Sequence, residues 1–382
     1  MRKSLITSFL FIVFFTTTYF AQKNVRDSLI TIGINQIYSI KFVKADSTFK
    51  TLSDKFPNDP AGIFFLSMID WWRILLNTTV EKYDDRFLEE LNFIIDKCDT
   101  ILEIEPNNVD VLFFKGGAIG FRGRLRSLRS SWFKAADDGR KALPIIEKVL
   151  LLEPNNNDAI FGLGIYNYYA SILPDKYPIL KPIMIFMSLT DKEEGLRQVK
   201  RTAEKGKYAK YEAIYFLMLI YFTDENKPLL SYNYSKKLTK DFPDNPVFEK
   251  WEGRIAAKIG NSLRASEIFK DVLLKGQKKM TGYIDDITKR EAVYYIADQY
   301  WKENKIDSSK IFFEDCVKYS KVIDKGKESG FYINALIYLG MINDVQKNRI
   351  AAIEYYNRVL DLDEYKKSHE LAEKYLENPY KK

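Results

Sequence analysis

Histidine is nearly absent from this sequence, since His369 is the only one among 382 residues. A lone histidine close to one end of a chain is usually a surface residue, and we assign it no catalytic role. Cysteine is also scarce. Cys98 and Cys316 lie far apart in the sequence, and together with one histidine they do not make a zinc-ligand cluster. We therefore predict no metal and no cofactor.

The sequence also lacks the short motifs of common enzyme families. It contains no phosphate-binding P-loop, no G-x-G-x-x-G after a strand and no G-x-S-x-G elbow. Gly162-Leu163-Gly164 falls where a helix is expected, so its glycines are interpreted as packing positions. These absences favour a protein that is not an enzyme.

Strict alternation of apolar and polar residues, the signal of a β-strand, is hard to find. Apolar residues make up 46% of the chain and charged residues 29%, which is typical of a globular protein. The net charge is only +7, and both signs are mixed along the expected helices. We therefore predict an all-α fold and no nucleic-acid partner.

Long apolar runs are missing except at the start of the chain. Arg2 and Lys3 precede an apolar stretch, and Ala21 is a suitable residue before a cleavage site. Residues 1–21 are therefore predicted to be a secretory signal peptide. We expect an exported protein, periplasmic or associated with the outer membrane. The alternative is an inner-membrane protein anchored by an uncleaved signal.

What the sequence does contain is a recurring pair of amphipathic helices, best seen in residues 331–365. Gly340 lies in the first helix, and Ala352, Tyr356 and Val359 line one face of the second. A small residue where two helices cross lets their backbones approach, and a large residue then fills the groove beside them. The same spacing returns in three other places: Gly33, Ala45, Phe49 and Leu52; Gly253, Ala265, Phe269 and Val272; Ala297, Ser309, Phe313 and Cys316.

Proline-containing turns separate the pairs. Pro57, Pro106, Pro154 and Pro243 each stand beside Asn or Asp, which favour a turn and the start of the next helix. The first two intervals between these prolines are 49 and 48 residues, against roughly 34 in a standard repeat. Enlarged repeats are therefore predicted in the N-terminal half.

The pattern resembles the tetratricopeptide repeat family over nearly all of residues 22–382. The enlarged repeats, with Gly116-Gly117 and Gly206-Lys207-Tyr208, look like exported bacterial members and, less closely, like the eukaryotic tetratricopeptide repeat protein 39 group. The resemblance implies a right-handed α-solenoid of about eight helix pairs that binds other proteins. Because repeats in a solenoid contact only their neighbours, Cys98 and Cys316 are expected to be buried free thiols rather than a disulfide.

Three segments stand apart from the regular pattern. Residues 173–189 contain three prolines and the apolar run Ile183–Met187. This run is interpreted either as a connector packed on the core or as an exposed lip that touches a partner or a membrane surface. Residues 275–286 are predicted to be a flexible link, and residues 368–376 a capping helix.

Aromatic residues recur on the first helices of the enlarged repeats. The inner face of this helix is the usual ligand groove in the repeat class, and rings suit an extended peptide or glycan because they give large contact area at low entropy cost. The alternative is that the longer helices bury these rings in the core. The rings expected on the inner face are Phe64, Trp71, Phe114, Phe121, Phe161, Tyr168 and Phe216.

Arginines gather near the end of the first helix of the third repeat. Arg122, Arg126 and Arg129 share one helix face, and three guanidinium groups together suit a carboxylate or phosphate ligand. The alternative is that they form ion pairs with Asp and Glu of adjacent helices.

These observations predict a non-catalytic protein–protein interaction scaffold of the bacterial cell envelope, which binds a partner segment in its concave groove. The alternative is a binding protein for an extended glycan or a small anionic ligand, which would use the groove aromatics and the arginines. The sequence identifies neither the partner nor the oligomeric state.

Overall fold

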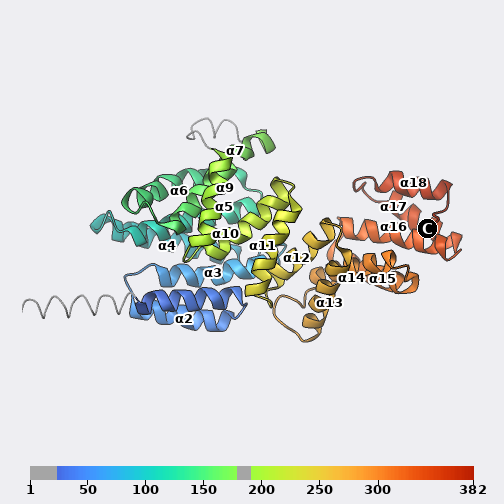
Figure 1. The fold of residues 1–382 in the computed structure, drawn as a ribbon, viewed down its shortest axis with the longest axis horizontal. Coiled ribbons are helices and arrows are strands. Elements are labelled where there is room, and N and C mark those ends of the chain that lie inside the picture. Colours follow the sequence, from blue (N-terminus) through green and yellow to red (C-terminus); the bar gives the residue numbers. More distant parts are fainter. Residues whose placement is uncertain (1–23, 179–190) are drawn as a thin grey trace, which may run out of the picture. The chain divides into compact units, whose positions relative to one another are not determined.

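The computed structural model describes residues 24–178 and 191–382. Over those ranges the chain consists of helices and turns, with no strand, as Figure 1 shows. The all-α fold class is therefore confirmed. The predicted signal peptide and the apolar run Ile183–Met187 lie outside the described residues. Among the described helices, none combines the length and the hydropathy needed to cross a bilayer.

The first described helical segment covers residues 24–38. In chain order the described helices make eight successive pairs, with α18 after the last pair, so the predicted solenoid of about eight helix pairs is confirmed. The elements that follow residues 24–38 are α2 (Phe42–Lys55), α3 (Ala61–Leu76), α4 (Asp84–Ile104), α5 (Val109–Leu128), α6 (Trp132–Leu152), α7 (Asn157–Lys176), α9 (Lys192–Lys205), α10 (Lys210–Leu219), the π-helix η2 (Ile220–Asp224), α11 (Pro228–Asp241), α12 (Pro246–Lys258), α13 (Ser262–Gln277), α14 (Asp286–Lys302), α15 (Ile306–Ile323), α16 (Gly330–Val345), α17 (Arg349–Leu360) and α18 (Ser368–Glu377).

The repeats of the N-terminal half are enlarged because their helices are long. Helices α4 and α6 have 21 residues each, and α5 and α7 have 20. By comparison, α12 has 13 residues and α17 has 12. The longer intervals between prolines in the sequence therefore correspond to extra helical turns.

Contacts divide the chain into two compact units, an N-terminal unit that ends at Ile220 and a C-terminal unit that begins at Tyr221. Within each unit every helix packs on the next one along the chain, from α2 to α10 and from α11 to α18. This sequential packing is the defining property of a solenoid. The division falls inside η2. The flexible link expected at residues 275–286 stays a prediction. In that segment Tyr283 is buried, and its hydroxyl donates a hydrogen bond to Glu249 at 2.7 Å.

The small residues of the repeat pattern lie where the two helices of a pair cross. A Cβ atom added to the glycine at this position would overlap the large buried ring of the second helix. The close approach of the helices therefore depends on the missing side chain. The same contact recurs between Gly33 and Phe49, between Gly253 and Phe269, and between Gly340 and Tyr356.

Replacing Gly33 by alanine is expected to destabilise the N-terminal unit by about 1–3 kcal/mol, because the added methyl group overpacks the Phe49 ring. The control is Gly120→Ala in helix α5, where an added Cβ meets nothing within 4 Å. That change should be neutral or stabilise by up to about 1 kcal/mol. Urea denaturation followed by circular dichroism measures both, and equal effects would contradict this packing.

Candidate functional site

Four of the seven aromatic residues predicted to line a groove lie in the interior of the N-terminal unit. The groove interpretation is wrong for the fully buried ones, and the core alternative describes them correctly. Three others, Phe121, Phe161 and Phe216, are half-buried. The residues that are at most 6% exposed are Phe64, Trp71, Phe114 and Tyr168.

The physical reason is that the N-terminal unit closes on itself. The ring of Tyr38, at the end of the first helical segment, lies 5.0 Å from the ring of Trp72 on α3. Its hydroxyl donates a hydrogen bond to Glu212 on α10, with the two oxygens 3.2 Å apart. At the other end of the segment, the Tyr208 hydroxyl donates to Asp27 at 2.8 Å. The first and last helices of the unit therefore lie side by side.

This closure fills the inner side of the unit with side chains of its own first helical segment. Ile30, Ile34 and Ile37 recur at helical spacing and are all buried. Burial, and then the carboxylate of Glu212, raises the pKa of Tyr38 well above its usual value. The Tyr38 hydroxyl therefore stays protonated and remains a donor over the physiological pH range.

The predicted aromatics do gather, but around an arginine that the sequence analysis did not single out. The guanidinium of Arg124 lies over the rings of Trp71 and Phe216, 4.6 Å and 4.4 Å from their centroids. The same guanidinium pairs with the buried carboxylate of Glu212. Rings stabilise a desolvated cation through their negative faces. Arg124 therefore joins α3, α5 and α10 inside the unit.

The other arginines of α5 also bind carboxylates of this chain. Asp138 on α6 is completely buried and accepts hydrogen bonds from Arg122 at 2.8 Å and from Arg126 at 2.6 Å. Arg129 donates to Asp84 at 3.0 Å and to the carbonyl oxygen of Thr78 at 2.6 Å. The anion clamp is therefore a wrong interpretation, and the ion-pair alternative is correct. The anionic-ligand hypothesis loses the arginines on which it depended.

The two cysteines and the single histidine take part in packing or in a hydrogen bond within the chain. Cys98 and Cys316 are buried free thiols, as predicted, and burial raises the pKa of each thiol to about 12. Thiols with so high a pKa are poor nucleophiles at neutral pH. The Nε2 atom of His369 lies 2.9 Å from the carbonyl oxygen of Leu362. Over residues 24–178 and 191–382, no cluster of three metal-binding side chains is found.

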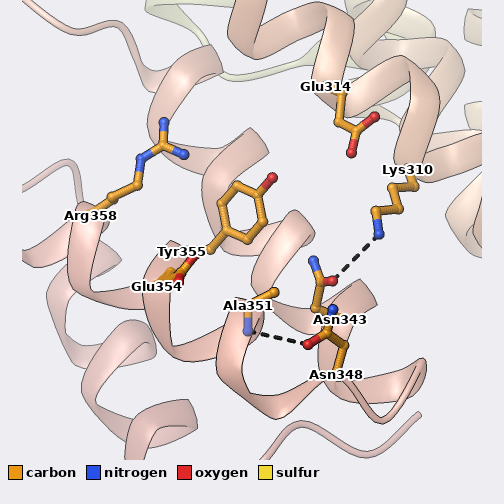
Figure 2. Close-up of a pocket in the computed structure, with 8 residues that line it drawn as sticks. All are labelled: Lys310, Glu314, Asn343, Asn348, Ala351, Glu354, Tyr355 and Arg358. Carbon is orange, nitrogen blue, oxygen red and sulfur yellow. Dashed lines mark hydrogen bonds between the residues drawn. The ribbon is translucent and has the colours of Figure 1, made fainter.

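A polar pocket of about 250 Å³ lies between α15, α16 and α17 in the C-terminal unit. Figure 2 shows Arg358 on one side of the Tyr355 ring and Lys310 with Glu314 on the other. No local motif in the sequence signals this pocket, because its residues come from three helices. Its lining residues are Lys310, Glu314, Asn343, Asn348, Ala351, Glu354, Tyr355 and Arg358.

The four charged side chains of this pocket do not pair with one another. Lys310 and Glu314, like Glu354 and Arg358, stand four residues apart on a helix, a spacing at which ion pairs form. Other helices of this chain use that spacing, as Lys141 does with Asp137 at 2.7 Å. Within the described chain, however, neither pair of the pocket makes an ion pair.

The two cations donate hydrogen bonds to neutral groups. The ammonium of Lys310 donates to Gln346 at 3.1 Å and to Asn343 at 3.4 Å, and Arg358 donates to the Tyr332 hydroxyl at 3.1 Å. Burial raises the pKa of Tyr355, and the carboxylates of Glu314 and Glu354 add to the rise while Arg358 opposes it. Two cations and two anions are thus held around one hollow and are able to meet an external ligand.

Comparison with known proteins finds fold likeness only. No family model matches the sequence, and no curated protein matches it. Among solved structures, Pseudomonas aeruginosa PilF shares 12% identity over 67% of this chain and 95% of its own, with a TM-score of 0.43. PilW, a type IV pilus biogenesis factor, shares 18% identity over 65% of this chain and 96% of its own, with a TM-score of 0.40.

A third similar structure is that of a human protein. The human IFIT1 dimer with m7Gppp-AAAA shares 13% identity over 84% of this chain and 68% of its own, with a TM-score of 0.41. At such identities the likeness concerns the fold alone, and no ligand or partner is carried over to this chain. The resemblance to the tetratricopeptide repeat protein 39 group stays a prediction.

Proposed function

We propose that this protein is a non-catalytic scaffold of the bacterial cell envelope that binds a segment of a partner polypeptide at the pocket between α15, α16 and α17. The observation that carries the proposal is the set of four charges without ion-pair partners that surround this pocket. A polypeptide segment with one acidic and one basic side chain complements them. Complementary charges of this kind fix the register of a bound chain and suppress wrong partners.

The size and the wall of the pocket favour a side chain of a partner over a free small molecule. Its volume of about 250 Å³ is below the roughly 300–1,000 Å³ of small-molecule sites, which are mostly apolar. Only Tyr355 supplies a large apolar surface, whereas six other lining residues are charged or carry an amide.

The N-terminal unit is a less suitable place for the partner site than the pocket of the C-terminal unit. Its first helical segment contacts α10 and buries Ile30, Ile34 and Ile37, which disfavours a partner segment at that place. The location in the cell envelope rests on the predicted signal peptide. N-terminal sequencing of the exported chain tests it, and the expected first residue is Gln22.

Cross-linking in the native cell envelope tests the partner site. We expect the Lys310→Ala, Arg358→Ala double variant to recover its partner at least about tenfold less than the unmodified protein, since losing charged hydrogen bonds at an interface costs about 2–5 kcal/mol. The matched control is Lys318→Ala, Lys321→Ala, which removes the same charge from exposed positions of α15.

Control and double variant should melt within a few degrees of the unmodified protein. A partner that the unmodified protein and the control recover, and that the double variant loses, supports the proposal. Equal recovery by all three proteins would overturn the pocket as the partner site.

A further inference from the structure

The chain segment after α18 folds back onto the C-terminal unit. The backbone N–H of Tyr380 donates a hydrogen bond to Oδ2 of Asp344, at 2.9 Å. The Asp344 carboxylate lies near the end of α16 and has no exposed surface. It is held in place by Arg349 at 2.9 Å and by the Tyr356 hydroxyl at 3.0 Å. Residues 378–382 therefore meet a fixed, buried acceptor.

Two side chains of this segment bind to the same small area. The Tyr380 ring lies 5.7 Å from the ring of Trp301 on α14 and 5.3 Å from the ring of Tyr375 on α18. The ammonium of Lys382 lies 4.1 Å from the centroid of the Trp301 ring and also donates to the Trp301 carbonyl oxygen. A cation over an indole face is the strongest of the cation–π pairs with natural side chains.

Apart from Tyr380, which is half-buried, the residues of the segment are exposed, Lys382 included. Asn378, Pro379 and Lys381 point into solvent, and in the described part of the chain Lys381 forms no hydrogen bond or ion pair. The Asn378 N–H donates to the Lys374 carbonyl oxygen of α18, and beyond it the segment is held by the Tyr380 N–H and by two alternate side chains, Tyr380 and Lys382. This is how an extended peptide is recognised on a protein surface: the backbone bonds give affinity, and pockets for alternate side chains give specificity.

We propose that Trp301, Asp344 and Tyr375 form a peptide site, the tail site, which residues 378–382 occupy in cis. The partner chemistry that fits it is an extended segment with a tyrosine followed two residues later by a lysine. This inference rests on the proposed function as an interaction scaffold and adds a second contact to it. A short tether gives an effective concentration in the millimolar range, so the site stays covered until a partner segment competes for it.

Fluorescence anisotropy of a labelled peptide, Asn-Pro-Tyr-Lys-Lys, tests the proposal on the full mature chain. The Tyr380→Ala, Lys382→Ala variant releases its own tail and is expected to bind this peptide at least about tenfold more tightly than the unmodified protein, whose site is covered. The Lys381→Ala variant keeps both anchoring side chains and should behave like the unmodified protein. A second peptide, with alanine in place of tyrosine, should bind to none of the three.

Three outcomes overturn the proposal. If the variant is folded by circular dichroism and binds no peptide, the segment is only a structural strap. If all three proteins bind the peptide equally, its site lies elsewhere. If sedimentation shows a dimer of the unmodified protein that the double variant does not form, the tail is exchanged between two copies. None of these measurements involves Lys310 or Arg358, so their failure leaves the proposed partner site untouched.

Discussion

The Asp138→Ala variant is expected to lose about 3–5 kcal/mol of unfolding free energy, because it leaves two partly buried guanidinium groups without their carboxylate. Asp138 is completely buried, while the side chains of Arg122 and Arg126 are only 14% and 26% exposed. Together these ion pairs join α5 to α6. Urea denaturation monitored by circular dichroism measures the loss in the transition of the N-terminal unit.

Asp137, the residue next to Asp138, provides a matched control for this prediction. Asp137 pairs with Lys141 at 2.7 Å and with Arg140 at 2.8 Å, but all three side chains are exposed. The hydrogen bond to Lys141, and then that to Arg140, lowers the pKa of Asp137. Solvent screens such pairs, so Asp137→Ala should cost no more than about 1 kcal/mol. If the two alanine variants were equally stable, Asp138 would not be what holds the arginines, and an anion clamp would have to be reconsidered.

The Trp71→Ala variant is expected to destabilise the N-terminal unit by about 3–5 kcal/mol, the range for deleting a large buried ring. Trp71 is 1% exposed and stacks on Phe87, with ring centroids 5.7 Å apart. Its loss also removes one ring from the guanidinium of Arg124. The change therefore creates a cavity and leaves a partly buried cation with less support.

An exposed ring of the same unit is the control for this prediction. Phe93 on α4 is 61% exposed, so Phe93→Ala should change the free energy of unfolding by no more than about 0.5 kcal/mol. The comparison also separates the two interpretations of the aromatics. A Trp71→Ala variant as stable as Phe93→Ala, but unable to recover a partner, would return Trp71 to a groove.

The helical repeat fold was predictable because its determinants are local. Gly340, Ala352 and Tyr356 lie close together in the sequence, and their spacing alone specifies how two helices cross. The long helices of the N-terminal half followed from the intervals between prolines, and the buried free thiols followed from sequential packing. In each case residues that contact one another are separated by a single helix pair or less.

The interior of the N-terminal unit was not predictable because it depends on contacts across the whole unit. Tyr38 and Glu212 are 174 residues apart, and Arg124 and Glu212 are 88 residues apart. The pattern that placed Trp71 and Tyr168 on an inner face is compatible with an open groove and with a closed interior. Only the position of the first helical segment beside α10 decides between them. The pocket of α15, α16 and α17 was missed for a similar reason, since its charges come from separate helices.

Hydrogen exchange of the mature protein, read by mass spectrometry of peptides that cover residues 28–38, tests the closure of the N-terminal unit most directly. Because Ile30, Ile34, Ile37 and Tyr38 are buried against the rest of the unit, these amides should exchange as slowly as those of α3. If residues 28–38 exchanged within seconds while α3 stayed protected, the first helical segment would not close the unit. The inner side would then be open to a partner, and the N-terminal unit would not be closed.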